Sequence, residues 1–297
     1  MSPATPSPAI PYSASQQDLF YPAHDLSSFP TVLPKTDAEL CAWMCLLAYC
    51  DNEPASFAFD QTTITSKLSA LGFQTAQFFE SKGHSKDGGT HCFLAIHDDP
   101  DPAKKLAVVA FRGTDADDPT DLIDDVDVPL VDWQGTSKVF DGWKDALAEV
   151  QDRLLPAIQP INYKLLITGH SLGAAMATLL ASLKTPMALY TIGSPRVGDA
   201  AFVASLAAVR SSRYVDCCDV VTELPPEDFG YAHLGKPLYI DRNRKITADP
   251  PAGTVTEDRL IARAEYLVKY AWKAGNVGVR DLADHAPINY VTAIAAA

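Results

Sequence analysis

Gly169, Ser171 and Gly173 have the types and the spacing that allow a serine hydroxyl to act as a nucleophile. An apolar run at 165–167 precedes them, and an alanine-rich segment that favours a helix follows. A serine on a sharp turn between a strand and a helix crowds the residues two before and two after it, so both must lack a side chain. The helix would also direct free N–H groups at the serine, where negative charge develops during acyl transfer. A plain tight turn is the alternative, but the strand before it and the helix after it favour the nucleophile.

Further motifs occur in a characteristic order around this stretch. VVAFRGT precedes GHSLGAAMA, and GSPRVGD, DVVTELPP and a late H-x-x-x-x-Y follow it. From about residue 38 to the C-terminus the chain resembles the class 3 lipase family, the fungal-type triacylglycerol lipases with the α/β-hydrolase fold. The resemblance implies a central, mostly parallel sheet flanked by helices, with a lid segment over the active site. Phe140 departs from the family pattern, which usually has His there, and this concerns packing below the site.

A serine nucleophile needs a histidine base and a carboxylate that fixes the tautomer of the histidine. In this fold the acid follows the serine, at the carboxyl end of a strand. Asp219 follows the predicted strand 213–217 and matches the D-V-V-x-x-L-P motif of the family, so we predict it as the acid. Alternation along the strand points its rival, Asp216, elsewhere. We interpret Glu223, in the next turn, as a solvated carboxylate.

Only two of the seven histidines, His233 and His285, follow this acid. His233 precedes what we predict to be the last strand, whereas His285 lies beyond that strand, on a loop before a C-terminal helix. Because the base follows the final strand in this fold, we predict His285 as the base. His170 lies inside the turn, and we expect it to shape the pocket without acting as the base.

The groups that would hold an oxyanion come from two places. The F-R-G-T stretch ends the most apolar predicted strand, 105–111, at the edge where open α/β sheets place their sites. The resemblance implies that Thr114 supplies one donor through its main-chain N–H, helped by its hydroxyl. The second donor follows from the turn itself and is the N–H of Leu172. An ordinary turn at the end of a strand is the alternative for F-R-G-T.

Apolar periodicity predicts the elements that position these residues. A capping box at 36–39 opens a helix, a second helix covers 61–71, and strands cover 75–80, 91–97 and 187–192. Three further helices are expected over 143–158, 198–209 and 257–273. In the last of these we expect one apolar stripe to pack on the sheet, formed by Leu260, Ile261, Ala264, Leu267, Val268, Ala271 and Trp272.

Residues 115–132 combine dense carboxylates with apolar side chains. Calcium is one interpretation, but Pro119 stands where an EF-hand needs its third acidic ligand and no glycine follows, so we do not expect a metal. The resemblance implies that this stretch is the lid. An apolar face bounded by charges suits a flap over an apolar acyl cleft.

Composition bounds the class of protein. The 297 residues include 24 Lys and Arg against 37 Asp and Glu, a net charge of −13, so the surface repels nucleic acid. We expect an extended arm over residues 1–34 and one α/β-hydrolase domain over 35–297. Neither a signal peptide nor a membrane span is apparent, which favours a soluble, cytoplasmic protein over a secreted mature form. The six cysteines include no C-x-x-C pair, and we interpret them as buried thiols. We expect the protein to be a monomer.

Together the patterns predict a serine hydrolase that cleaves carboxylic esters of acylglycerols through an acyl-enzyme, without a cofactor. Ser171, His285 and Asp219 would be the triad, and Thr114 and Leu172 would hold the oxyanion. A lipid–water interface is the additional partner that such a substrate suggests. A phospholipase, an aryl esterase or an acyltransferase would use the same residues. A lipid-binding relic without activity is less expected, because relics lose one of these residues and this chain has them all.

Overall fold

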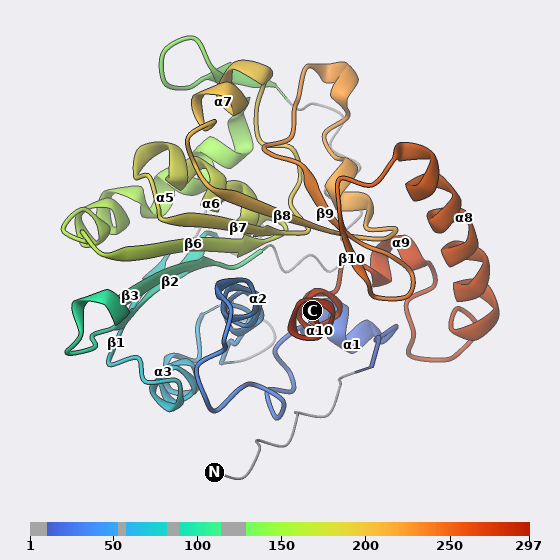
Figure 1. Cartoon of the computed structure of the whole chain (residues 1–297), viewed down its shortest axis with the longest axis horizontal. Coiled ribbons are helices and arrows are strands. Elements are labelled where there is room, and N and C mark those ends of the chain that lie inside the picture. Colours follow the sequence, from blue (N-terminus) through green and yellow to red (C-terminus); the bar gives the residue numbers. More distant parts are fainter. Residues whose placement is uncertain (1–10, 53–57, 82–88, 114–128) are drawn as a thin grey trace.

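The computed structural model describes residues 11–52, 58–81, 89–113 and 129–297. Its centre is an eight-stranded sheet in the order β1-β2-β3-β6-β7-β8-β9-β10 (Figure 1). The strands from β3 to β9 are parallel, and an antiparallel pair lies at each edge. The prediction of a mostly parallel sheet flanked by helices is therefore confirmed. The strands are β1 (Thr75–Glu80), β2 (His91–His97), β3 (Leu106–Phe111), β6 (Lys164–His170), β7 (Ala188–Ile192), β8 (Ser211–Asp216), β9 (Pro237–Ile240) and β10 (Ile246–Ala248).

Helices cover both faces of the sheet (Figure 1). Helices α2 (Asp37–Leu47), α3 (Gln61–Ala70) and α10 (Pro287–Ala295) cover one face, and α5 (Asp141–Ile158), α6 (Leu172–Leu183) and α7 (Ala200–Ser205) cover the other. The central strands are buried on both sides: Leu166 of β6 packs in the first layer, while Leu165 and Ile167 pack in the second. Burial on both faces explains the uninterrupted apolar runs of β3 and β6.

Smaller elements complete the described part of the chain. They are α1 (Gln16–Phe20), β4 (Leu130–Asp132), β5 (Lys138–Phe140), α8 (Ala252–Lys269), α9 (Arg280–Ala283) and three 3₁₀ turns, η1 (Pro102–Lys104), η2 (Val220–Glu223) and η3 (Glu227–Phe229). β4 and β5 pair with each other outside the main sheet. Within the described ranges, no helix is both long and apolar enough to cross a membrane.

The capping box forms as predicted, because the Thr36 side chain accepts a hydrogen bond from the N–H of Glu39. The segment before it is less extended than expected, since it contains α1. Residues 11–20 pack against the C-terminal part of the chain: Val277 donates its N–H to the Ala14 carbonyl at 2.8 Å, and the Tyr12 hydroxyl donates to Asp284, also at 2.8 Å. The helix was not predicted, because this segment is largely polar and the helix is only five residues long.

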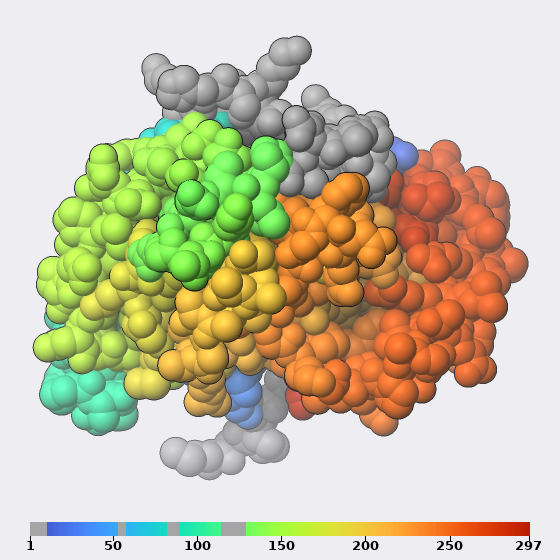
Figure 2. Space-filling view, turned by 90° about the horizontal axis from the view of Figure 1, so that it is seen from above, coloured from blue at the N-terminus to red at the C-terminus, as the bar shows by residue number. Residues whose placement is uncertain are grey.

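Helix α8 contradicts one prediction. Four large members of the expected inner stripe, Leu260, Leu267, Val268 and Trp272, are 60% to 75% exposed. The buried side chains of α8 are instead Asp258, Ala262 and Tyr266, and two of these are polar. They can face inward because they are hydrogen-bonded: Asp258 accepts from Arg242, and the hydroxyl of Tyr266 donates to the Val277 carbonyl. Figure 2 shows the α8 region, in orange-red, forming one flank of the molecule.

Candidate active site

Ser171 lies on a tight turn between β6 and α6. Its backbone angles, a φ of 57° and a ψ of −130°, are outside the regions that residues with a side chain usually adopt. A Cβ atom on Gly169 would lie 2.2 Å from the Gly173 carbonyl oxygen, and one on Gly173 would lie 2.5 Å from the Phe111 carbonyl oxygen. Glycine is therefore required at both positions, which is the steric reason that the spacing suggested.

The fold brings Ser171, His285 and Asp219 together from distant parts of the chain. The Nε2 atom of His285 lies 2.9 Å from the Ser171 hydroxyl, and its Nδ1 atom lies 2.9 and 3.0 Å from the two Asp219 carboxylate oxygens. None of the three residues is more than 5% exposed. A carboxylate can only accept, so Nδ1 carries the proton and Nε2 is free to accept from the serine. This arrangement can remove a proton from Ser171.

Tyr290 is a further member of this network, and its role was not predicted. Its hydroxyl donates to Asp219 at 2.5 Å and accepts from the N–H of Asp216 at 3.0 Å. Burial and the neighbouring Asp219 raise the pKa of Tyr290 well above its usual value. With the N–H of Val221 also donating at 3.0 Å, the Asp219 carboxylate is held from several sides. The H-x-x-x-x-Y motif was the available signal.

The two rival acids form ion pairs with arginines. Asp216 pairs with Arg244, whose guanidinium lies 2.7 and 2.9 Å from its two oxygens, and burial raises the pKa of Asp216. Glu223 pairs with Arg259 and is half-exposed. Neither carboxylate is hydrogen-bonded to His285 in the structure.

The rival histidine is also engaged elsewhere. The Nε2 atom of His233 lies 2.8 Å from the main-chain oxygen of Thr222. Burial, with Arg213 and Arg196 nearby, lowers the pKa of His233 to about 3. His233 therefore stays neutral, and its ring hydrogen-bonds to the main chain instead of to Ser171.

The two predicted oxyanion donors differ in what the structure describes. Leu172 is the first residue of α6, so its N–H is among those that a helix leaves without an intrahelical acceptor. Thr114 and most of the predicted lid, 115–128, lie outside the described residues. The described end of this stretch does reach the site: a Cβ atom on Gly113 would lie 3.0 Å from the Ser171 Cβ atom. Residues 130–132 of the predicted lid form β4.

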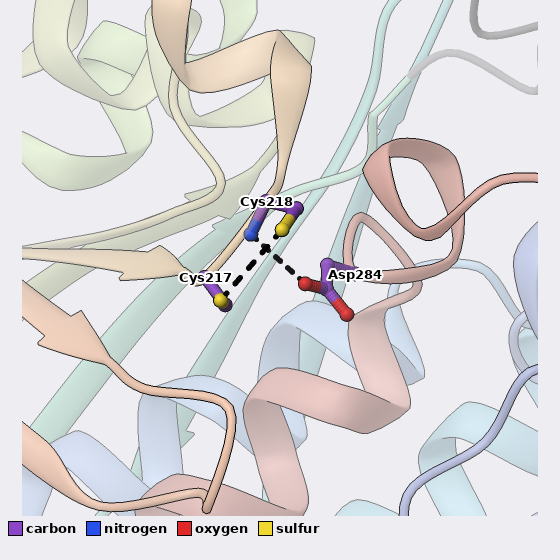
Figure 3. Close-up of side chains that lie close together, drawn as sticks. All are labelled: Cys217, Cys218 and Asp284. Atoms are coloured by element: carbon purple, nitrogen blue, oxygen red, sulfur yellow. Dashed lines mark hydrogen bonds between the residues drawn. The ribbon is translucent and has the colours of Figure 1, made fainter. Parts of the chain in front are cut away.

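Two thiols and a carboxylate, those of Cys217, Cys218 and Asp284, form a buried cluster (Figure 3). Cys217 and Cys218 precede Asp219, and their sulfur atoms are 3.7 Å apart, while Asp284 precedes His285. The Asp284 carboxylate already accepts from Arg280, from Tyr12 and from the N–H of Cys218. Because its oxygens are occupied, we interpret the cluster as a hydrogen-bonded joint between the two loops that carry Asp219 and His285.

Comparisons with known proteins find similarity to lipases. The family model described as Lipase (class 3) matches residues 108–229, which include Ser171 and Asp219. The lipase of Rhizomucor miehei is 33% identical over 163 residues, which cover 49% of this chain and 44% of that protein. Over this stretch the chain resembles the class 3 lipase family.

A second relative extends the comparison. A secreted mono- and diacylglycerol lipase of Fusarium solani is 34% identical over 110 residues, which cover 34% of this chain and 33% of that protein. The chain thus matches less than half the length of these curated relatives.

Solved structures of lipases show the same fold over a longer stretch. The native propeptide complex of Rhizomucor miehei lipase is 26% identical, with a TM-score of 0.54, and the match covers 82% of this chain and 88% of that one. The mono- and diacylglycerol lipase of Aspergillus oryzae is 24% identical, with a TM-score of 0.58, over 73% and 87% of the two chains. The fold is therefore the α/β-hydrolase fold.

Proposed function

We propose that this protein is a serine hydrolase that cleaves carboxylic ester bonds of acylglycerols. The observation that carries the proposal is the hydrogen-bonded line from Ser171 through His285 to Asp219, buried at the start of α6. A nucleophile, a base and an orienting carboxylate in this order are the parts that acyl transfer requires.

In the proposed reaction His285 accepts the proton of Ser171 while the serine oxygen attacks the acyl carbonyl. Asp219 stabilises the imidazolium that forms, and His285 then gives the proton to the departing alcohol. Water, activated by the same histidine, releases the acid and restores the serine. The N–H groups of Leu172 and Thr114 would donate to the oxyanion, and such a donor typically contributes about 3 kcal/mol to the transition state.

The names of the relatives support an acylglycerol substrate, since they are lipases and mono- and diacylglycerol lipases. We propose that the substrate is met at a lipid–water interface. The exposed apolar face of α8, with Leu267 and Val268, ends beside Lys269, Lys273 and Trp272, a combination that suits a lipid surface. Leu267→Gln with Val268→Gln should lower hydrolysis of an emulsified triacylglycerol and leave that of a soluble short-chain ester unchanged. Equal loss on both substrates would contradict a role at the interface.

The decisive experiment compares wild type with Ser171→Ala on p-nitrophenyl esters of increasing chain length. We expect turnover to fall on the order of a million-fold, because the remaining groups of a triad cannot replace the nucleophile. Ser194→Ala is the matched control, since Ser194 is equally buried and its hydroxyl donates to the Pro195 carbonyl. A fluorophosphonate should label wild type at Ser171 and leave the Ser171→Ala variant unlabelled.

If Ser171→Ala is as active as wild type, or if the label is found on another residue, Ser171 is not the nucleophile. A panel with phospholipid, aryl ester and alcohol acceptors then separates lipase from phospholipase, aryl esterase and acyltransferase activity on the same triad.

A further inference from the structure

His170, the residue before the proposed nucleophile, is buried between two groups that it hydrogen-bonds. Its Nδ1 atom lies 2.7 Å from the Tyr49 hydroxyl, and its Nε2 atom lies 2.9 Å from the main-chain oxygen of His285. Tyr49 lies just after α2, His170 is the last residue of β6, and His285 lies in the loop before α10. The proposed mechanism gives His170 and Tyr49 no role.

The direction of each hydrogen bond follows from the chemistry of the groups. The His285 carbonyl can only accept, so Nε2 of His170 carries the proton. A neutral imidazole has one proton, and Nδ1 must therefore accept from the Tyr49 hydroxyl. The hydrogen bonds form a directed chain from Tyr49 through His170 to the backbone of His285.

We propose that Tyr49 and His170 are positioning residues that hold the main chain of His285 at the distance from Ser171 which proton transfer requires. This inference rests on the proposed function. Asp219 fixes the ring of His285 through Nδ1, but a ring also moves when its backbone moves. The hydrogen bond from His170 restrains that backbone, and a small misplacement of a catalytic group has a large effect on rate.

The place of His170 in the chain explains why it suits this role. His170 is joined directly to Ser171, so the residue whose side chain hydrogen-bonds the backbone of the base is covalently linked to the nucleophile. Tyr49 in turn contacts the end of β3: a Cβ atom on Gly113 would lie 2.1 Å from its hydroxyl oxygen. The same hydroxyl is thus placed between the residue before Thr114 and the support of His285.

The charge state of His170 is consistent with support and not with proton transfer. The rings of His170 and His285 are 4.6 Å apart, and burial together with His285 holds the pKa of His170 well below its usual value. A second imidazolium at this distance would oppose the one that forms on His285 during the reaction. The neutral ring can keep its hydrogen bonds while His285 changes charge.

The test measures kcat and KM on soluble p-nitrophenyl butyrate for Tyr49→Phe, His170→Leu, His170→Gln and the double variant Tyr49→Phe with His170→Leu. We expect kcat to fall 10- to 100-fold in His170→Leu and about 10-fold in Tyr49→Phe, with KM within about twofold, because the reacting groups remain but are misplaced. His170→Gln should recover most of the loss, since its amide N–H can donate to the same carbonyl.

The double variant should be no slower than His170→Leu, because two links of one chain are lost only once. Tyr266→Phe is the control for removing a buried tyrosine hydroxyl away from the site, and it should keep wild-type kcat. Fluorophosphonate titration of Ser171 and the melting temperature identify any variant that has not folded. Wild-type kcat in His170→Leu, no recovery in His170→Gln, or losses that multiply in the double variant would each overturn the inference. An inactive, unlabelled wild type would instead refute the proposed function.

Discussion

The Asp219 carboxylate is saturated with donors, and this has measurable consequences. It accepts from His285, from Tyr290 and from the N–H of Val221, in a site that excludes solvent. A carboxylate so held keeps one orientation, which in turn fixes the ring of His285. Removing any one of these donors should therefore change the rate of the proposed reaction.

We predict that Tyr290→Phe lowers kcat about tenfold and the free energy of unfolding by about 1.5 to 3 kcal/mol, the range for a hydrogen bond to a charged group. The loss arises because one oxygen of Asp219 and the N–H of Asp216 lose a buried partner. Tyr266→Phe removes a buried hydroxyl that donates to the Val277 carbonyl at 2.7 Å, away from the triad. That control should lose stability and keep kcat, as ester assays and urea unfolding can establish.

His233 predicts a dependence of stability on pH. Its pKa is lowered to about 3 by burial and by the two nearby arginines, so the unfolded chain binds a proton that the folded one does not. The stabilisation is complete above the unfolded pKa of about 6.5 and is lost as the pH falls toward 3, at up to about 1.4 kcal/mol per pH unit.

Between pH 7 and 5, the free energy of unfolding measured in urea should therefore fall less steeply with decreasing pH for His233→Gln than for wild type. His24→Gln, at an exposed position, is the control that should not change the slope in this way. An unchanged slope in His233→Gln would mean that this histidine does not contribute to the acid sensitivity.

How much the sequence could predict depends on how local each constraint is. The turn around Ser171 was predictable because its two glycines are required by contacts within a few residues. Asp219 and His285 were predictable from their order after the sheet strands. Tyr49 and His170 were not, because their bond joins residues 121 positions apart and depends on how α2 packs against β6.

At the scale of elements, strands were predicted more accurately than surface helices. β1 and β2 have the predicted bounds, since the turns that flank them are strong signals. α8 was predicted with the wrong face inward, because a hydrogen-bonded Asp258 and Tyr266 could not be distinguished by type from solvated residues. β10 was not predicted, and at three residues it carries too few side chains for a periodic signal.

The junction of β6 and α6 predicts a contrast between two glycines. Gly173→Ala should destabilise the protein by about 3 kcal/mol, because its Cβ atom would meet the main chain of Phe111 and Arg112, which cannot move aside. Gly253→Ala, near the start of α8 and in open space, should stabilise it by up to about 1 kcal/mol. Thermal unfolding of both variants decides the matter, and a Gly173→Ala protein as stable as wild type would contradict the crowded turn.

At the scale of the molecule, residues 12 and 13 are hydrogen-bonded to the C-terminal part of the chain near the site. Asn289 of α10 exchanges two hydrogen bonds with the main chain of Ser13, each 2.8 Å long, and Tyr12 lies against Asp284 beside His285. In Figure 1, α1 accordingly lies next to α10. The N-terminal segment therefore supports the loop that carries the proposed base.

The outward face of α8 predicts that polar substitutions there are tolerated. Leu267→Gln with Val268→Gln should change the free energy of unfolding by less than about 0.5 kcal/mol, as is usual for exposed positions. Tyr266→Ala, one residue away and buried, should cost about 3 kcal/mol or more. Similar losses in both variants would show that the face of α8 is covered in solution.

All six cysteines are buried, and a thiol reagent can reach them only when their surroundings open. Burial also raises the pKa of Cys45 and Cys50 to about 12, so the reactive thiolate is scarce while these residues stay buried. The rate of labelling would thus measure how often the surroundings of each thiol open. Labelling of Cys217 and Cys218 would report on the loops around Asp219, and labelling of Cys45 and Cys92 would report on the core. One reagent could therefore tell whether the site opens more readily than the rest of the molecule.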